Sequence, residues 1–402
     1  MTWLRDFRAF FRIRGAAPLI AGMFLYGIGS GILAPMNAVY MRDGIGLGKA
    51  EIASIFSISL LFNMTAAFAI GLISDRMAKK KRLAVCAVPL CIAGLLLYMQ
   101  ADGYVLALIG LVLAVAPSGL IMGQLFAMAR SHFMREAAGY FEMAQIWLRA
   151  TLSVGFFTGL LAGANVYLVA GFHGVLWGNL LGYALLLLCL LLYKEQDAAA
   201  ADNTSIGEPF SLVMLLALLL LCCADSLRGL YLPLVVVNLF GKPQEMSYLW
   251  SVQAVFELLF MTLAGYWAAR YGSKRIMIIS SVFALAVYMT YAFGPPLAVF
   301  FLAQPLYSFF VSVLYGVAMG YVQRMFHLRI GFGSSVYVSL TQLAALIGYL
   351  LPFLVPGYRP AIFAIPALLV LAALALIGAN AAVVRRKKRT YGAEAVLTEN
   401  QA

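Results

Sequence analysis

The chain is 402 residues long, 64% of them hydrophobic and 11% charged, whereas soluble domains have about 25% charged residues. Apolar runs of about 18 or more residues recur, each long enough to cross a bilayer as a helix, so the composition excludes a soluble globular protein. The net charge of +12 would suggest nucleic acid as the partner of a soluble protein, but cytoplasmic loops of membrane proteins collect Lys and Arg. We expect a polytopic membrane protein without a nucleic-acid partner.

Apolar runs separated by polar loops predict twelve transmembrane helices in two sets of six. The first set covers residues 16–40, 51–74, 83–100, 104–128, 140–163 and 166–192. The second set covers residues 211–237, 246–269, 275–293, 296–321, 333–355 and 360–383. The predicted domains are an N-terminal six-helix bundle at 1–193, a cytoplasmic linker at 194–209, a C-terminal six-helix bundle at 210–384 and a cytoplasmic tail at 385–402.

The distribution of Lys and Arg predicts the orientation in the membrane. Alternate segments, both termini included, are rich in these residues, whereas the intervening loops contain only Arg42, Lys49, Lys242 and Arg359. Because positive residues stay inside, both termini are expected to be cytoplasmic, in a multi-pass protein of the inner (plasma) membrane. The five cysteines lie inside apolar runs and the three histidines are scattered, so we expect no disulfide, metal or cofactor.

A basic loop joins the second and third predicted spans. It contains Gly71, Asp75 and Arg76 followed by a Lys/Arg cluster, and it resembles the loop motif between helices two and three of major facilitator transporters. A weaker copy, 194 residues later, contains Gly265 and Arg270. The repeat predicts an all-α membrane protein with two pseudo-symmetric six-helix bundles, the major facilitator fold, and substrate binding between the halves. The motif would gate the transporter; the alternative is a charge run that only sets the orientation.

The fifth predicted span contains charged residues. Glu142, Gln145 and Arg149 share one helix face. A charge at this depth is costly unless it is paired or hydrated, so Arg149 is expected to face a central cavity, with a clamp between helices as the alternative. Further along this span, Gly155, Gly159 and Gly163 predict close helix contact. They resemble a fifth-helix motif of exporters, except that this chain has Leu160 where the motif has a proline.

The seventh and eighth predicted spans also contain ionisable residues. Asp225, Arg228 and Tyr231 follow one another along the seventh span, where the two charges form either part of the cavity or a self-neutralising pair. Gln253 and Glu257 share a face of the eighth span, and Glu257 has no basic residue within a turn of it. We expect Glu257 to load and release the coupling proton, assisted by Asp225, with a structural hydrogen bond as the alternative.

Further polar and aromatic residues in the apolar runs are candidates to bind substrate, because amides bond to hydroxyl groups and aromatic faces stack on sugar rings. For each of these residues taken alone, the alternative is a role in helix packing. These candidates are Tyr26, Asn37, Asn63, Gln124, Trp147, Gln304, Tyr307 and Gln342.

Several segments resemble the sugar efflux transporters of bacteria. They are Gln124 to Arg130, Arg135-Glu136-Ala, Trp147-Leu-Arg149-Ala, Asp225 to Pro233 with the next leucine, and Glu257 to Gly265 with the next tyrosine. The resemblance implies proton-driven export of sugars or glycosides, with Arg149 and Glu257 at positions that match the family pattern. The family prefers an amide at position 225 and an aromatic residue at 228, so Asp225 and Arg228 are departures that could favour a charged or zwitterionic ligand.

These observations predict a secondary active transporter and not an enzyme. The expected function is proton-coupled export, by antiport, of sugars, glycosides or related small polar molecules. The near alternative is a multidrug exporter of lipophilic or cationic compounds, and the remote one is a membrane-embedded enzyme acting on lipid-linked substrates. Expected partners are a small-molecule substrate, protons and the lipid bilayer, and the resemblance implies a monomer.

Overall fold

The computed structural model describes residues 10–74, 80–137, 141–195, 208–326 and 330–379, and across these ranges the chain forms helices and short connections without strands. The N-terminal half contains α2 (Ala17–Leu33), α3 (Asn37–Val39), η1 (Tyr40–Gly44), α4 (Lys49–Ser74), α5 (Lys80–Met99), α6 (Tyr104–Val115), α7 (Ser118–Glu136) and α8 (Phe141–Leu192). The C-terminal half contains α9 (Leu212–Phe240), α10 (Gln244–Tyr271), α11 (Ser273–Ala292), α12 (Leu297–Leu302), α13 (Gln304–Ser312), η3 (Val313–Val317), α14 (Ala318–Met325), α15 (Ile330–Leu350), η5 (Leu351–Leu354) and η6 (Pro360–Phe363). A last helix follows η6 as far as residue 379.

Ten segments of the described chain are long and apolar enough to cross a membrane. One of them, Trp147–Leu192, covers two predicted spans. The chain reverses within it at Gly171, whose φ of 59° suits glycine. The all-α membrane fold is confirmed, while the count of twelve crossings and the domain boundaries stay predictions.

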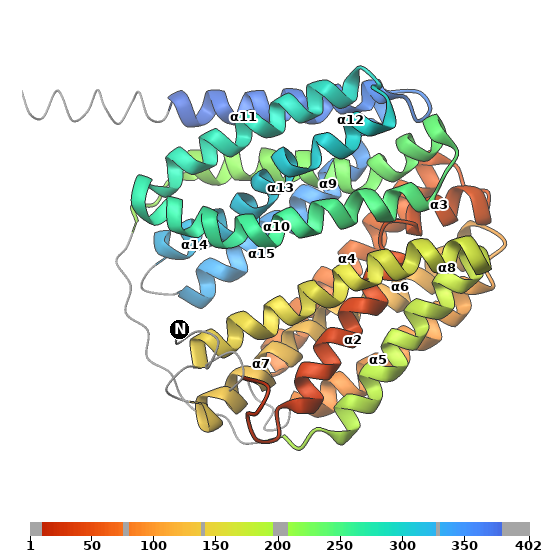
Figure 1. The fold of residues 1–402 in the computed structure, drawn as a ribbon, viewed down its shortest axis with the longest axis vertical. Coiled ribbons are helices and arrows are strands. Elements are labelled where there is room, and N and C mark those ends of the chain that lie inside the picture. Colours follow the sequence, from red (N-terminus) through yellow and green to blue (C-terminus); the bar gives the residue numbers. More distant parts are fainter. Residues whose placement is uncertain (1–9, 75–79, 138–140, 196–207, 327–329, 380–402) are drawn as a thin grey trace, which may run out of the picture.

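The helices form two bundles, one from α2–α8 and the other from α9–α15 (Figure 1). Contacts between the bundles involve α8 with α10, α4 with α15, and α3 with α9. The central helices that meet across this interface are therefore the ones that can line a cavity between the halves.

Glycines bring α2 and α8 into close contact. A Cβ atom on Gly155, Gly159 or Gly163 of α8 would overlap backbone atoms of α2, and one on Gly27 or Gly31 of α2 would overlap backbone atoms of α8. The close helix contact predicted from the glycine stripe is confirmed. It fixes the position of α8, which also contacts α10 of the other bundle.

The bundles are held together at one end by two cations from the N-terminal half. Lys49 Nζ donates to the carbonyl oxygens of Pro352, Val355 and Gly357 at 2.7, 2.5 and 2.9 Å. Arg42 donates to the Leu234 carbonyl of α9 at 3.0 Å. Both cations lie in loops predicted to face outward, so this end is the predicted extracellular one.

The opposite end contains a larger cavity of about 920 Å³ in the C-terminal half. Its lining includes Met261 and Gly265 of α10 and Arg324 of α14. A Cβ atom on Gly265 would meet no neighbour in the described chain, and Arg270 is exposed, so α10 is not packed against the described part of the other half here. Among the described residues, the two halves are therefore joined at the predicted extracellular end, and a cavity lies at the predicted cytoplasmic end.

Candidate substrate-binding cavity

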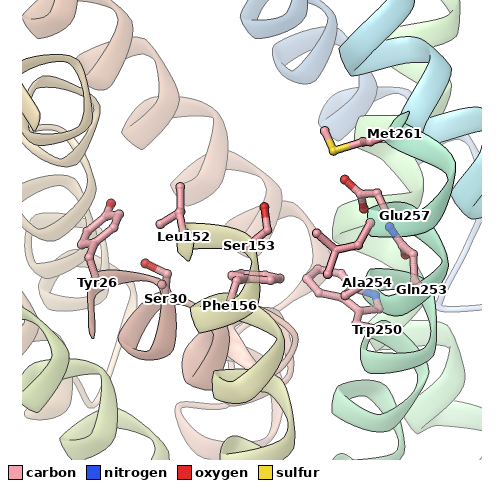
Figure 2. A pocket seen from close by; sticks show the side chains of 12 residues that line it. Tyr26, Ser30, Leu152, Ser153, Phe156, Trp250, Gln253, Ala254, Glu257 and Met261 are labelled. Atoms are coloured by element: carbon pink, nitrogen blue, oxygen red, sulfur yellow. The ribbon is translucent and has the colours of Figure 1, made fainter. Parts of the chain in front are cut away.

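A cavity of about 300 Å³ lies between α2 and α8 of one bundle and α10 of the other. Figure 2 shows side chains from the two bundles facing each other across it. Met261 lines both this cavity and the larger one, so the two adjoin. The lining residues are Tyr26, Gly27, Ser30, Leu152, Ser153, Phe156, Trp250, Gln253, Ala254, Glu257, Leu258 and Met261.

The cavity combines aromatic surfaces with a few polar groups. Tyr26, Phe156 and Trp250 supply the rings, and hydroxyl, amide and carboxyl groups lie among them. The indole N–H of Trp250 is buried and has no hydrogen-bond partner among the described residues. A buried donor without a partner costs about 1–3 kcal/mol, which a ligand acceptor would offset. The lining therefore suits a small polar ligand with an apolar face.

Glu257 is the carboxyl group of this cavity, and Figure 2 shows its side chain directed from α10 toward the α8 side. The Gln253 amide, one turn earlier on α10, lies beside it in the cavity lining. Arg149 of α8 is exposed but is not among the residues that line this cavity, so its predicted contact with substrate stays a prediction. Its charge acts on Glu257 from the other bundle, as do the charges of Asp225 and Arg228 of α9.

Asp225 and Arg228 form no direct ion pair, because each has other hydrogen-bond partners. Asp225 accepts hydrogen bonds from the hydroxyl groups of Tyr307 and Tyr315, the latter at 2.6 Å. Arg228 is only 3% exposed, and its guanidinium group lies over the Tyr307 ring, 3.7 Å from the centroid. The intrahelical ion pair considered from the sequence is wrong, and neither residue lines the cavity.

Three of the predicted substrate or proton ligands line the cavity: Tyr26, Gln253 and Glu257. Several others lie elsewhere because they complete hydrogen bonds inside one bundle. Asn37 accepts from Tyr98 at 2.7 Å, and Asn63 donates to the Val115 carbonyl at 2.7 Å, where α6 gives way to α7. Their placement does not support the predicted contact with substrate.

Other predicted ligands are part of the packing. Tyr231 donates to the Tyr349 carbonyl at 2.8 Å near the closed end, and Trp147 packs edge-on against Phe10. The remaining predicted ligands outside the cavity lining are Gln124 (buried), Gln304 and Tyr307 (buried in the C-terminal bundle) and Gln342 (half-buried). Tyr231, Gln304 and Tyr307 bond to neighbouring helices of the C-terminal bundle and not to groups of the cavity.

Some predicted site residues lie outside the described part of the chain. These are Asp75 and Arg76 of the basic loop, and the side chains of Glu142 and Gln145 at the start of α8. Gly71 lies within α4, with its surroundings outside the described residues. The gating role of this motif stays a prediction.

Sequence reasoning missed several cavity residues. Ser30, Ser153, Phe156 and Met261 line the cavity, but serine, phenylalanine and methionine are ordinary in transmembrane helices and stand out only once the facing helices are known. Trp250 could have been found, because it shares a helix face with Gln253 and Glu257. Among the described residues no group of His, Cys, Asp and Glu could hold a metal ion.

Comparison with known proteins decides the family. The model of the Major Facilitator Superfamily matches residues 19–220 and 214–399. The chain belongs to this superfamily. It is therefore a membrane transporter of small molecules and not an enzyme.

Curated relatives at low identity are sugar efflux transporters. The transporter is 24% identical to sugar efflux transporter A of Dickeya chrysanthemi over 81% of this chain and 84% of that protein. It is 25% identical to a putative sugar efflux transporter of Deinococcus radiodurans over 90% and 95%. The transporter thus resembles the sugar efflux family, as its sequence motifs indicated.

Solved structures agree on the fold. The nucleoside transporter NupG superposes with a TM-score of 0.73 at 15% identity, covering 92% of this chain and 98% of that one. A bacterial homologue of the iron transporter ferroportin, in its inward-facing state, gives a TM-score of 0.67 at 18% identity, covering 90% and 98%. The major facilitator fold is confirmed.

Proposed function

We propose that the transporter is a proton-coupled exporter of sugars, glycosides or related small polar molecules, working by alternating access. The observation that carries this proposal is the cavity, in which Glu257 lies among rings and hydrogen-bonding groups between the two bundles. Rings stack on the apolar faces of sugars, and amide, hydroxyl and indole groups bond to their hydroxyl groups. The resemblance to sugar efflux transporters supports the same substrate class.

The positive-inside distribution supports an inner-membrane location with both termini in the cytoplasm. In that orientation the cavity adjoins the cytoplasm, and the contacts of Lys49 and Arg42 close the external side. Substrate would enter from the cytoplasm in this state. A single chain contains the whole cavity, which supports a monomer within the lipid bilayer.

Glu257 would couple export to the proton gradient. The carboxylate lies in the cavity that substrate would fill, so substrate and proton would compete for one site, directly or through the conformation. A proton entering from outside would then favour substrate release outward, and its loss to the cytoplasm would reset the site. Asp225 accepts hydrogen bonds from two tyrosine hydroxyls inside the C-terminal bundle, whereas the Glu257 carboxyl group lines the cavity.

Transport by the purified protein in liposomes tests the proposal. A thermal-shift screen of sugars, glycosides, amino sugars and cationic drugs first selects a ligand, which is then followed as a labelled solute. We expect an imposed pH gradient to drive its accumulation, and Glu257→Gln to abolish the response to the gradient while exchange of labelled for unlabelled solute continues. Glu51→Gln is the matched control, because that carboxylate bonds to the Gly48 amide at 2.7 Å, away from the cavity.

Two results would overturn the proposal. Accumulation that ignores both the pH gradient and Glu257→Gln would exclude this proton site. Transport of unrelated lipophilic cations without any sugar would establish the multidrug alternative, for which the apolar side chains of Leu152, Leu258 and Met261 would supply the contact surface.

A further inference from the structure

We propose that Arg228 is a positioning residue that fixes the orientation of the Gln253 amide and thereby directs its N–H groups toward Glu257. The inference rests on the proposed function of Glu257 as the proton site. It explains why a buried arginine is present inside the C-terminal bundle at a position from which it does not reach the cavity.

The contacts of Arg228 carry the first step. Its Nη1 donates to Gln253 Oε1 at 2.8 Å and its Nη2 donates to Gln304 Oε1 at 2.9 Å. A guanidinium group has only donors, so each glutamine must present its oxygen to Arg228. Each amide nitrogen then has to point away from the arginine. The orientation of both amides follows from the chemistry of their shared partner.

Gln304 shows the consequence within the same network. Its Nε2, turned away from Arg228, donates to the Tyr291 hydroxyl at 2.7 Å and to the Phe300 carbonyl at 2.8 Å. Gln304 is fully buried, so this arm of the network ends inside the protein. It provides an acceptor for the Arg228 Nη2 donor on the side away from the cavity.

Gln253 is the second acceptor of Arg228, and its side chain lines the cavity. Its oxygen accepts from Arg228, and Glu257 lines the same cavity beside it. Figure 2 shows the nitrogen end of Gln253 on the same side of α10 as the Glu257 carboxyl group. With its oxygen turned toward Arg228, Gln253 presents its N–H groups to Glu257, and a donor favours the carboxylate over the protonated acid.

The surroundings hold this arrangement in place. On α13, the Ser308 hydroxyl donates to the main-chain carbonyl of Gln253 at 2.9 Å, and the Ser312 hydroxyl donates to the main-chain carbonyl of Glu257 at 3.1 Å. The α10 backbone is therefore held at both residues. The charged groups that act on Glu257 are Asp225 and Arg228 from α9 and Arg149 from α8. Arg228 could therefore act through its charge or through Gln253, and the two routes make different predictions.

The test follows the protonation of Glu257 without needing a substrate. Infrared difference spectra of the purified protein, recorded over a range of pH, report the carbonyl stretch of the protonated acid, and its loss in Glu257→Gln assigns the band. We expect Gln253→Leu to raise the midpoint of this titration by about one pH unit, the size of one lost hydrogen bond to a charged group. Gln304→Leu, which removes the other arm, should leave the midpoint unchanged.

Combining substitutions separates the two routes. Arg228→Met should raise the midpoint in the wild-type background and add nothing in the Gln253→Leu background, because the arginine acts through the amide. An equal shift in both backgrounds would overturn the proposal in favour of a direct charge effect, as would an unchanged midpoint in Gln253→Leu. If Arg228→Met does not fold, Arg228→Lys, which retains the charge and loses the two-pronged donor, takes its place with the same expectation.

Failure of this proposal differs from failure of the proposed function. If Glu257 does not couple transport, Glu257→Gln leaves gradient-driven accumulation intact, whatever the infrared midpoints do. If Arg228 does not act through Gln253, transport still depends on Glu257. In that case Arg228→Met shifts the titration midpoint equally in the wild-type and Gln253→Leu backgrounds.

Discussion

Lys49 of the N-terminal bundle donates to the carbonyl oxygen of Val355 in the C-terminal half at 2.5 Å. Two more carbonyls, of Pro352 and Gly357, complete a cage around the same ammonium group, and the Tyr231 ring lies 5.4 Å from it. A cation from one bundle that is bound by backbone oxygens of the other has to leave them whenever this end opens. We therefore expect this lysine, together with Arg42, to stabilise closure of the predicted extracellular end.

Lys49→Gln should shift the equilibrium toward opening at this end, because an amide cannot bond to three carbonyls as an ammonium group does. A loss of about 1.4 kcal/mol from the closed form would raise the open fraction tenfold. Distances between spin labels on the loop before α4 and on the residues after η5, in a cysteine-free background, measure that fraction.

Lys81→Gln is the matched control for Lys49→Gln. Lys81 Nζ donates to the carbonyls of Leu191 and Tyr193 at 3.0 and 2.6 Å, but donor and acceptors belong to the same bundle. Its loss should leave the distance distribution unchanged. Equal broadening in both variants would mean that Lys49 contributes only to folding.

Gly159→Ala should lower the melting temperature of the purified protein by several degrees. The added methyl group would overlap the Ile28 carbonyl of α2, and overpacking of this kind typically costs about 1–3 kcal/mol. Gly123→Ala is the control, because Gly123 also lies in a helix and its Cβ would meet no neighbour in the described chain. That change should be neutral or slightly stabilising, and equal losses in the two variants would contradict the role of the glycine stripe.

Features that depend on the residue types along one helix, such as the spans and the candidate proton site, could be predicted from the sequence. The residues that line the cavity could not, because they depend on which helices face each other. Apolar length predicted the spans, and an isolated carboxyl in an apolar run singled out Glu257, which lines the cavity. Gln304 carried the same signal, yet its partners come from α9, α11 and the end of α12 and bury it. A polar residue in an apolar run must find partners, but its sequence does not say whether those partners are protein or ligand.

Tyr315→Phe should destabilise the C-terminal bundle. The Tyr315 hydroxyl donates to Asp225 at 2.6 Å, and a hydrogen bond to a charged group typically contributes about 1.5–3 kcal/mol. In an Asp225→Asn background the same change should cost less, because the amide is uncharged. Melting temperatures of the four proteins give the coupling between the two residues.

Tyr321→Phe serves as the control for Tyr315→Phe. The Tyr321 hydroxyl is buried without a hydrogen-bond partner among the described residues, so its removal should be neutral. If Tyr315→Phe lowers the melting temperature equally with and without Asp225→Asn, the two groups are not coupled.

Trp250→Phe should weaken binding of the transported solute without unfolding the protein. The change keeps a ring in the cavity and removes the indole N–H, which has no partner within the described chain and is free to donate to a ligand. The loss of one hydrogen bond, about 1 kcal/mol, corresponds to roughly fivefold weaker binding, measured by titration calorimetry. Trp267→Phe is the matched control on the same helix, because Trp267 packs against Phe309 away from the cavity. Unchanged affinity in Trp250→Phe would mean that the indole N–H does not contact the solute.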